Sequence, residues 1–145
     1  MPVSQFVLNQ LSVGQAKTIR VDVTEKDIDA FSTLSGDVSP IHVDAVSAKQ
    51  RGFTGRVAHG LLIGAYVSRF IGNELPGANG ILREIEFGFK RPLVPPQTIE
   101  IEGTITHISE GTGQVTIEFN ITDTSKNLIT KAKAKTMVRG PIDNA

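Results

Sequence analysis

The spacing of apolar residues predicts a strand and then a helix near the start of the chain. Residues 18–23 alternate between polar and apolar side chains, which is the period of a strand with one buried face. Thr24 followed by Asp27 forms a capping-box pattern, so a helix is predicted directly after this strand. Gly36 suits the end of that helix. The apolar residues that recur at helical spacing between these limits are Ile28, Phe31 and Leu34.

The middle of the chain holds a long polar segment and then a strongly apolar one. Residues 36–56 lack a clear period, apart from a predicted short helix over residues 45–50, and loops of this length usually serve a function. Residues 59–72 carry apolar side chains on nearly all sides of a predicted helix. A helix of that kind is expected to be surrounded by protein.

The last part of the chain predicts four strands, which we expect to pair in sequence as an antiparallel meander. Their ranges are 81–89, 98–108, 114–122 and 128–138. The element order predicts an α+β fold, in which one strongly curved antiparallel sheet wraps around the long apolar helix. Residues 1–145 are expected to form a single domain. Because so short a sheet cannot enclose the helix completely, we also expect two copies to associate as a homodimer.

Composition excludes several classes of protein. The 15 basic residues balance the 15 acidic ones, so no net field favours nucleic acid or an anionic membrane as a partner. The absence of cysteine excludes disulfides and cysteine-based chemistry. The first residues lack the pattern of a signal peptide, and no apolar run approaches the roughly 20 residues that span a bilayer. These features predict a cytoplasmic protein.

The polar segment contains a candidate acid–base pair in residues 36–42, which read Gly-Asp-Val-Ser-Pro-Ile-His. Pro40 pushes Ser39 toward an extended conformation, so Asp37 and His42 cannot lie on one continuous helix. Ser39 is in place to cap a new turn that starts at Pro40, and the bend would bring the carboxylate and the imidazole together. A neutral imidazole can accept a proton from water while a carboxylate orients the same water. The same residues also suit an ordinary turn after a helix, and only the wider motif separates the two readings.

That wider motif resembles the signature of the MaoC-like, (R)-specific enoyl-CoA hydratases. The resemblance includes residues 31–42, with Ala48 beyond them, and a second block over residues 57–62 that reads Val-Ala-His-Gly-Leu-Leu. Ser68 matches a serine near the active site of that family, and residues 75–77 and 87–92 fit the segments that follow. The resemblance spans roughly residues 13–138, nearly the whole chain.

The resemblance implies a hot-dog fold, a homodimer and an acyl-CoA substrate, with no cofactor. The implied reaction is syn hydration of trans-2-enoyl-CoA to the (R)-3-hydroxyacyl thioester. By analogy with the family, Asp37 and His42 activate one water that attacks C3 and return a proton to C2, and their division of these steps stays open. The backbone N–H of Gly60 would polarise the thioester carbonyl.

Three further residues are expected to support the site. Ser39 stands where the family usually has asparagine, and we expect this change to alter activity or substrate preference. His59 either packs at the start of the helix and holds the loop, or takes part in catalysis directly. Ser68 either hydrogen-bonds back to its own helix or supports the Asp37 and His42 site. His107 is expected on the surface.

No metal site is predicted, because the three histidines lack the close spacing of common zinc motifs. Several basic residues near the loop and the first strand of the meander are candidates for contact with CoA phosphates, although such side chains are more often solvated surface. They are Lys49, Arg51, Arg56, Arg83, Lys90 and Arg91.

Two other kinds of function compete with the hydratase. The first is a different hot-dog enzyme, either a 3-hydroxyacyl-ACP dehydratase or a thioesterase, many of which carry a carboxylate on the central helix. Residues 59–73 contain no carboxylate, which favours the hydratase. The second is a non-catalytic module that binds acyl thioesters, for which the departure at Ser39 is the most favourable feature.

Overall fold

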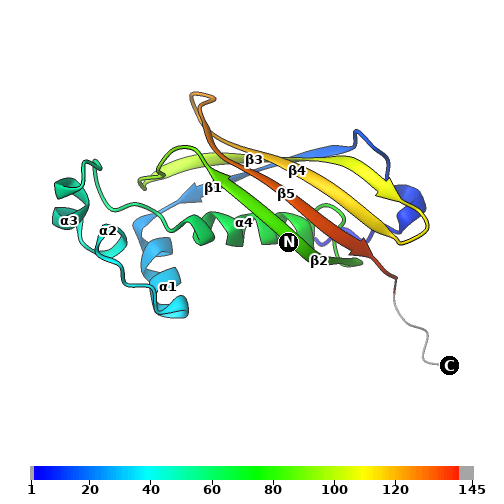
Figure 1. The fold of residues 1–145 in the computed structure, drawn as a ribbon, viewed down its shortest axis with the longest axis horizontal. Coiled ribbons are helices and arrows are strands. Elements are labelled where there is room, and N and C mark those ends of the chain that lie inside the picture. The colour runs from blue at the N-terminus through cyan, green and yellow to red at the C-terminus, as the bar shows by residue number, and fades with distance from the viewer. Residues whose placement is uncertain (1, 141–145) are drawn as a thin grey trace.

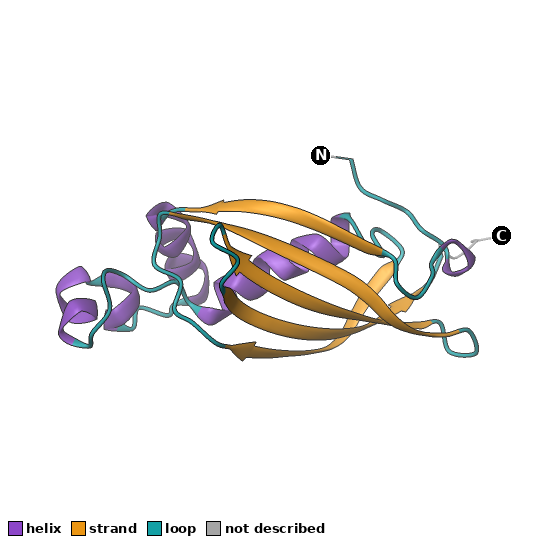
Figure 2. Ribbon diagram, turned by 90° about the horizontal axis from the view of Figure 1, so that it is seen from above, coloured by secondary structure: helices purple, strands orange, loops and turns teal. Residues whose placement is uncertain are grey.

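The computed structural model describes residues 2–140, which form a curved antiparallel sheet, a long helix on its concave side and a helical segment at one end (Figures 1 and 2). The five strands of the sheet are β1 (Ala16–Val23), β2 (Gly80–Phe89), β3 (Gln97–Ser109), β4 (Gln114–Asp123) and β5 (Leu128–Val138). The helices are α1 (Glu25–Ser35), α2 (Pro40–Val43), α3 (Ala45–Gln50) and α4 (Gly60–Asn73), with a short 3-10 turn, η1 (Leu8–Gln10), near the start.

The strand order is β1-β3-β4-β5-β2, and every neighbouring pair is antiparallel. The predicted meander of four strands is therefore wrong for β2, which pairs with β5 at the opposite side of the sheet from β1. Short turns join β3 to β4 and β4 to β5, as a hairpin requires. Residues 90–96 between β2 and β3 hold three prolines, which cannot donate to a strand ladder, and there the chain crosses to the other side of the sheet.

Helix α4 packs into the concave side of the sheet, and the core lies between them (Figure 2). The packing is tight at Gly103 of β3, where a Cβ atom would come within 2.7 Å of the rings of both Phe70 and Phe119. These two rings meet edge to face with centroids 5.1 Å apart. The predicted α+β class, with a curved antiparallel sheet around a central helix, is confirmed.

One side of α4 stays uncovered, which corrects the prediction of a helix surrounded by protein. Leu61 is 63% exposed, and Ala65 and Ser68 also lie on the open side. The sheet covers only one side of the helix (Figure 1). The buried members of α4 are Leu62, Ile63, Val67, Phe70 and Ile71.

Helices α1, α2 and α3 extend beyond the end of the sheet (Figure 1). The capping box of α1 is confirmed, because Asp27 accepts from the Thr24 N–H at 2.8 Å and Thr24 accepts from the Asp27 N–H at 3.3 Å. Gly36 ends this helix in a left-handed conformation with φ 78°. Of the apolar residues at helical spacing, Ile28 is buried, whereas Leu34 is 85% exposed.

The short helix predicted over residues 45–50 is confirmed as α3, and the new turn predicted to start at Pro40 is confirmed as the single turn α2. Within residues 2–140, every helix is too short or too polar to cross a bilayer.

Candidate active site

The structure brings Asp37, His42 and His59 together from three separate elements. Asp37 lies in the loop after α1, His42 on the single turn α2, and His59 directly before α4. A carboxylate oxygen of Asp37 and one nitrogen from each ring all lie within 4.8 Å of one another. Asp37 is exposed, His42 is half-buried and His59 is 2% exposed, so the group runs from solvent into the protein.

Local hydrogen bonds set the bend between Asp37 and His42. The Ser35 hydroxyl accepts from the Asp37 N–H at 3.1 Å, and the Asp37 carboxylate accepts from the Ser39 N–H at 3.1 Å. This second contact is an Asx turn, which ends the extended stretch and lets Pro40 begin α2. The Ser39 side chain makes no capping hydrogen bond, so its predicted capping role is wrong. The cap position is held by the backbone of Ser39 instead.

One hydrogen bond fixes the tautomer of His42. Its Nδ1 lies 2.6 Å from the carbonyl oxygen of Val57. Because a carbonyl oxygen can only accept, Nδ1 of the neutral ring carries the proton and Nε2 carries the lone pair. His42 can therefore take a proton from a water molecule at Nε2 without first changing its tautomer.

His59 contacts both other members of the group. Its Nε2 lies 3.0 Å from the carbonyl oxygen of Asp37 and 3.2 Å from the hydroxyl of Ser32. Its ring stacks on that of His42 with centroids 3.9 Å apart and planes 22° apart, and it also packs against Phe31. The buried Nδ1 has no hydrogen-bond partner within residues 2–140. These are the contacts of a residue that holds the loop.

Gly60 begins α4 immediately after His59. Its N–H makes no hydrogen bond to any residue in the range 2–140, as expected for the first turn of a helix. Gly60 also lines a hollow of about 450 Å³, together with Phe53, Ile63 and Phe89. An oxygen that approaches Gly60 from this hollow would meet a free donor at the positive end of a helix dipole.

Ser68 lies apart from this group. It is exposed on the uncovered side of α4, and its hydroxyl makes no hydrogen bond within the described range 2–140. The predicted hydrogen bond from Ser68 back to its own helix is therefore not formed. His107 is exposed on β3, as predicted.

The geometry of the group suits proton transfer better than metal binding. Asp37, His42 and His59 satisfy the distance that a shared metal requires, but the two rings are stacked. The lone pairs of imidazole nitrogens lie in the ring planes, so nearly parallel rings direct them side by side and do not converge on one ion. Nδ1 of His42 is also occupied by Val57.

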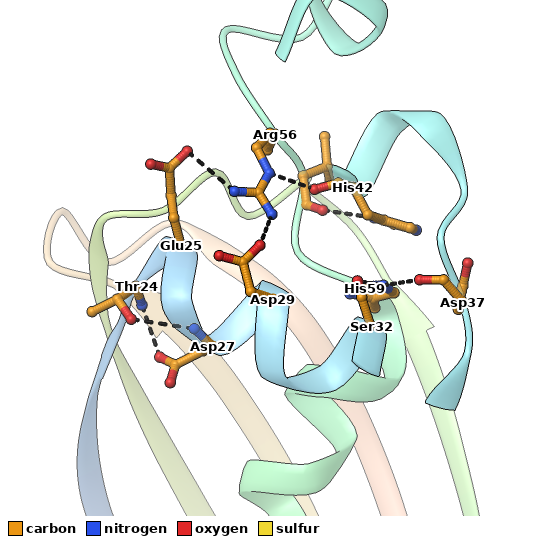
Figure 3. A network of polar contacts seen from close by, with 10 residues as sticks. Thr24, Glu25, Asp27, Asp29, Ser32, Asp37, His42, Arg56 and His59 are labelled. Carbon is orange, nitrogen blue, oxygen red and sulfur yellow. Dashed lines mark hydrogen bonds and ion pairs between the residues drawn. The ribbon is translucent and has the colours of Figure 1, made fainter. Parts of the chain in front are cut away.

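Sequence reasoning missed the contacts of Arg56. This residue was a candidate for phosphate contact, but its side chain is only 14% exposed and is held by protein groups (Figure 3). It donates from Nε to the carbonyl oxygen of His42 at 2.7 Å and pairs with Asp29 and, at 4.0 Å, Glu25. The two acids occupy neighbouring turns of α1, and this spacing is the signal that could have revealed a cation docked against the helix.

Two shifted titrating groups lie near the site. Hydrogen bonds from the Ser47 hydroxyl and the Val46 N–H lower the pKa of Asp44, the residue that caps α3. Burial raises the pKa of the Tyr66 phenol on α4, and the charge of Asp27 raises it further. Tyr66 is therefore neutral at physiological pH.

Comparison with known proteins gives a consistent result. Residues 10–127 match the family model described as MaoC like domain. The (R)-specific enoyl-CoA hydratase of Rhodospirillum rubrum is 31% identical over 125 residues, which cover 86% of each chain. The R-hydratase PhaJ1 of Pseudomonas aeruginosa superposes with a TM-score of 0.89 at 26% identity, over 99% of this chain and 94% of that one. The (R)-hydratase of Aeromonas caviae superposes with a TM-score of 0.84 at 26% identity, over 88% and 97% of the two chains.

The sheet wrapped around α4 is thus the hot-dog fold of these hydratases, as the sequence resemblance implied. With a family model that matches most of its length, the chain belongs to the MaoC-like domain family.

Proposed function

We propose that this protein is an (R)-specific enoyl-CoA hydratase, which adds water reversibly to trans-2-enoyl-CoA and forms (R)-3-hydroxyacyl-CoA. The observation that carries the proposal is the placement of the Asp37 carboxylate and the His42 imidazole within 4.8 Å of one another, with the His42 lone pair at Nε2. The relatives named as (R)-specific enoyl-CoA hydratases support the same reaction.

In this proposal Asp37 and His42 hold one water molecule between them. They remove a proton as the oxygen attacks C3, and a proton returns to C2 on the same face of the substrate. Negative charge develops on the thioester oxygen during the attack, and the free N–H of Gly60 stabilises it. Of the predicted supporting residues Ser39, His59 and Ser68, only His59 has contacts with both Asp37 and His42 that support such a role.

A homodimer remains part of the proposal. Exposed apolar side chains on the open side of α4 and on β2 support it, because water contact with such residues is unfavourable. They include Leu61, Ile81, Leu82 and Phe89, which are 63%, 49%, 41% and 51% exposed. β2 is also an edge strand, so its outer backbone groups are free to pair with a second copy. A cytoplasmic location and a single domain over residues 1–145 stay predictions.

The direct test is loss of enoyl absorbance when crotonyl-CoA is added to the purified protein, followed by chiral assignment of the product. We expect Asp37→Ala and His42→Ala each to reduce turnover by at least about a hundredfold while the fold is retained. His107→Ala is the matched control, because it removes an exposed imidazole far along the chain. Turnover near the native level in His42→Ala would remove this residue from the mechanism.

Further measurements distinguish the alternative functions. Release of free CoA from a saturated acyl-CoA would indicate a thioesterase, although α4 contains no carboxylate to serve it. Turnover of the enoyl group only on acyl carrier protein would indicate an ACP dehydratase. Binding of crotonyl-CoA without turnover would indicate a non-catalytic module.

A further inference from the structure

The main chain of α2 cannot by itself hold His42 in place. α2 is one turn of four residues, and a helix this short is unstable in isolation. Its local support includes the hydrogen bonds from the His42 N–H to the Ser39 carbonyl and from the Asp44 N–H to the Pro40 carbonyl, each 2.9 Å long. The position of the His42 ring must therefore come from contacts with the rest of the protein.

Residues 56 and 57 supply those contacts. The Val57 N–H donates to the Ile41 carbonyl at 3.0 Å, and the Val57 carbonyl accepts from Nδ1 of His42 at 2.6 Å. The third contact comes from Arg56, whose Nε–H donates to the His42 carbonyl at 2.7 Å. Residue 57 contributes only backbone groups to these contacts, whereas Arg56 contributes its side chain, so a substitution that leaves the His42 ring intact can remove only the Arg56 contact.

The guanidinium group is fixed on its other side by α1. It pairs with Asp29 and lies 4.0 Å from Glu25, and Figure 3 shows the three side chains meeting above α1. The two carboxylates are 62% and 56% exposed, so these ion pairs contribute little to stability. Their effect is to hold the guanidinium group in one position. A planar guanidinium with several donors can contact α1 and the His42 carbonyl at the same time.

On this basis, and given the proposed hydratase reaction, we propose that Arg56 is a positioning residue, which ties the His42 backbone to α1 and so keeps the imidazole beside Asp37 with its lone pair at Nε2. Arg56 does not touch the substrate. It acts through His42, and the tie explains why a largely covered cation lies beside the backbone of the proposed catalytic histidine. Without it, the Val57 contacts and the stacking on His59 would still hold the His42 ring, but the backbone of α2 would lose its tie to α1 and the ring would be held less firmly in one orientation.

The test combines kinetics with the tautomeric state of His42. We expect Arg56→Met to lower kcat on crotonyl-CoA by about tenfold, with KM within about twofold, because small misplacement of a reacting group slows chemistry more than binding. The chain has three histidines, so long-range proton–nitrogen NMR spectra can separate their tautomers. The native protein should show one His42 tautomer, with the proton on Nδ1, and Arg56→Met should show a mixture.

Matched variants make the result specific. Arg56→Lys keeps the charge and one donor, and should recover part of the lost kcat. Lys135→Met removes the cation of a sheet ion pair, 3.6 Å from Glu84, and should leave both readouts unchanged. Native kcat and a single His42 tautomer in Arg56→Met would overturn the proposal.

If Arg56→Met does not fold, the variants Asp29→Asn and Arg56→Lys test the proposal in its place. A native kcat and a single His42 tautomer in both variants would overturn it. If the native protein fails to hydrate crotonyl-CoA, the proposed reaction is wrong, but the tautomer comparison still decides whether Arg56 positions His42.

Discussion

The imidazole rings of His42 and His59 stack with their centroids 3.9 Å apart and their planes 22° apart. His42 faces the Asp37 carboxylate, whereas His59 is buried and donates from Nε2 to the carbonyl of Asp37. One buried side chain therefore contacts the ring of the first proposed catalytic residue and the backbone of the second. This arrangement couples the position of the loop after α1 to the start of α4.

His59→Ala should lower kcat on crotonyl-CoA by between about tenfold and a hundredfold, because both Asp37 and His42 lose a contact that orients them. His59→Gln can still donate to the Asp37 carbonyl but lacks the stacked ring, so an intermediate loss is expected. Steady-state kinetics with folding checked by circular dichroism would measure both. A native kcat in His59→Ala would show that the stacked ring is dispensable.

Gly60→Ala should reduce activity and stability through two separable effects. The added Cβ would lie 2.7 Å from the Phe89 ring, which must move aside, at a cost of about 1 kcal/mol in unfolding free energy. The methyl group also crowds the N–H that is proposed to bind the thioester oxygen, with an expected loss of about tenfold in kcat.

The double variant Gly60→Ala/Phe89→Leu separates these effects. It should recover the stability measured by thermal unfolding, because the smaller side chain leaves room for the methyl group, while kcat stays low. Recovery of kcat together with stability would instead assign the whole effect to the clash with Phe89.

Short-range signals in the sequence predicted the elements well. The Thr24 and Asp27 capping box, the left-handed Gly36 and the helix over residues 45–50 are all present, because each depends on residues a few positions apart. The convergence of Asp37 and His42 was predictable for the same reason, since Pro40 determines the bend between them.

Long-range relationships could not be predicted in the same way. The pairing of β2 with β5 depends on the path of the chain across the sheet, and nothing within residues 81–89 encodes the partner strand. The contact of Arg56 with Asp29 also joins residues far apart in the chain, so the spacing of Glu25 and Asp29 on α1 can indicate a docked cation but cannot identify it as Arg56. The prediction that α4 is surrounded by protein failed on its exposed side. An apolar pattern does not distinguish the core of one chain from a surface that a second copy would cover.

Gly103→Ala should destabilise the fold by about 1 to 3 kcal/mol, because its Cβ would come within 2.7 Å of the rings of Phe70 and Phe119 in a packed core. Gly111→Ala is the matched control, since nothing lies within 4 Å of its Cβ position in the β3–β4 turn. Its effect should stay within about 0.5 kcal/mol. Urea unfolding would measure both, and equal stabilities would show that the core at Gly103 can expand without cost.

Asp44 should make the stability of the protein depend on acid pH. The hydrogen bonds from Ser47 and Val46 hold the pKa of its carboxyl below the ordinary value of 3.8, so the folded state binds this proton less readily than the unfolded state. The stabilisation is therefore complete above pH 3.8 and is lost as the pH falls through the lower folded pKa. Urea unfolding of the native protein and of Asp44→Asn should give a difference in unfolding free energy at pH 6 that shrinks by pH 3. Ser47→Ala, which removes the largest cause of the shift, should reproduce part of this change. A difference that stays constant over the same range would show that the Asp44 carboxylate does not contribute to folding through its charge.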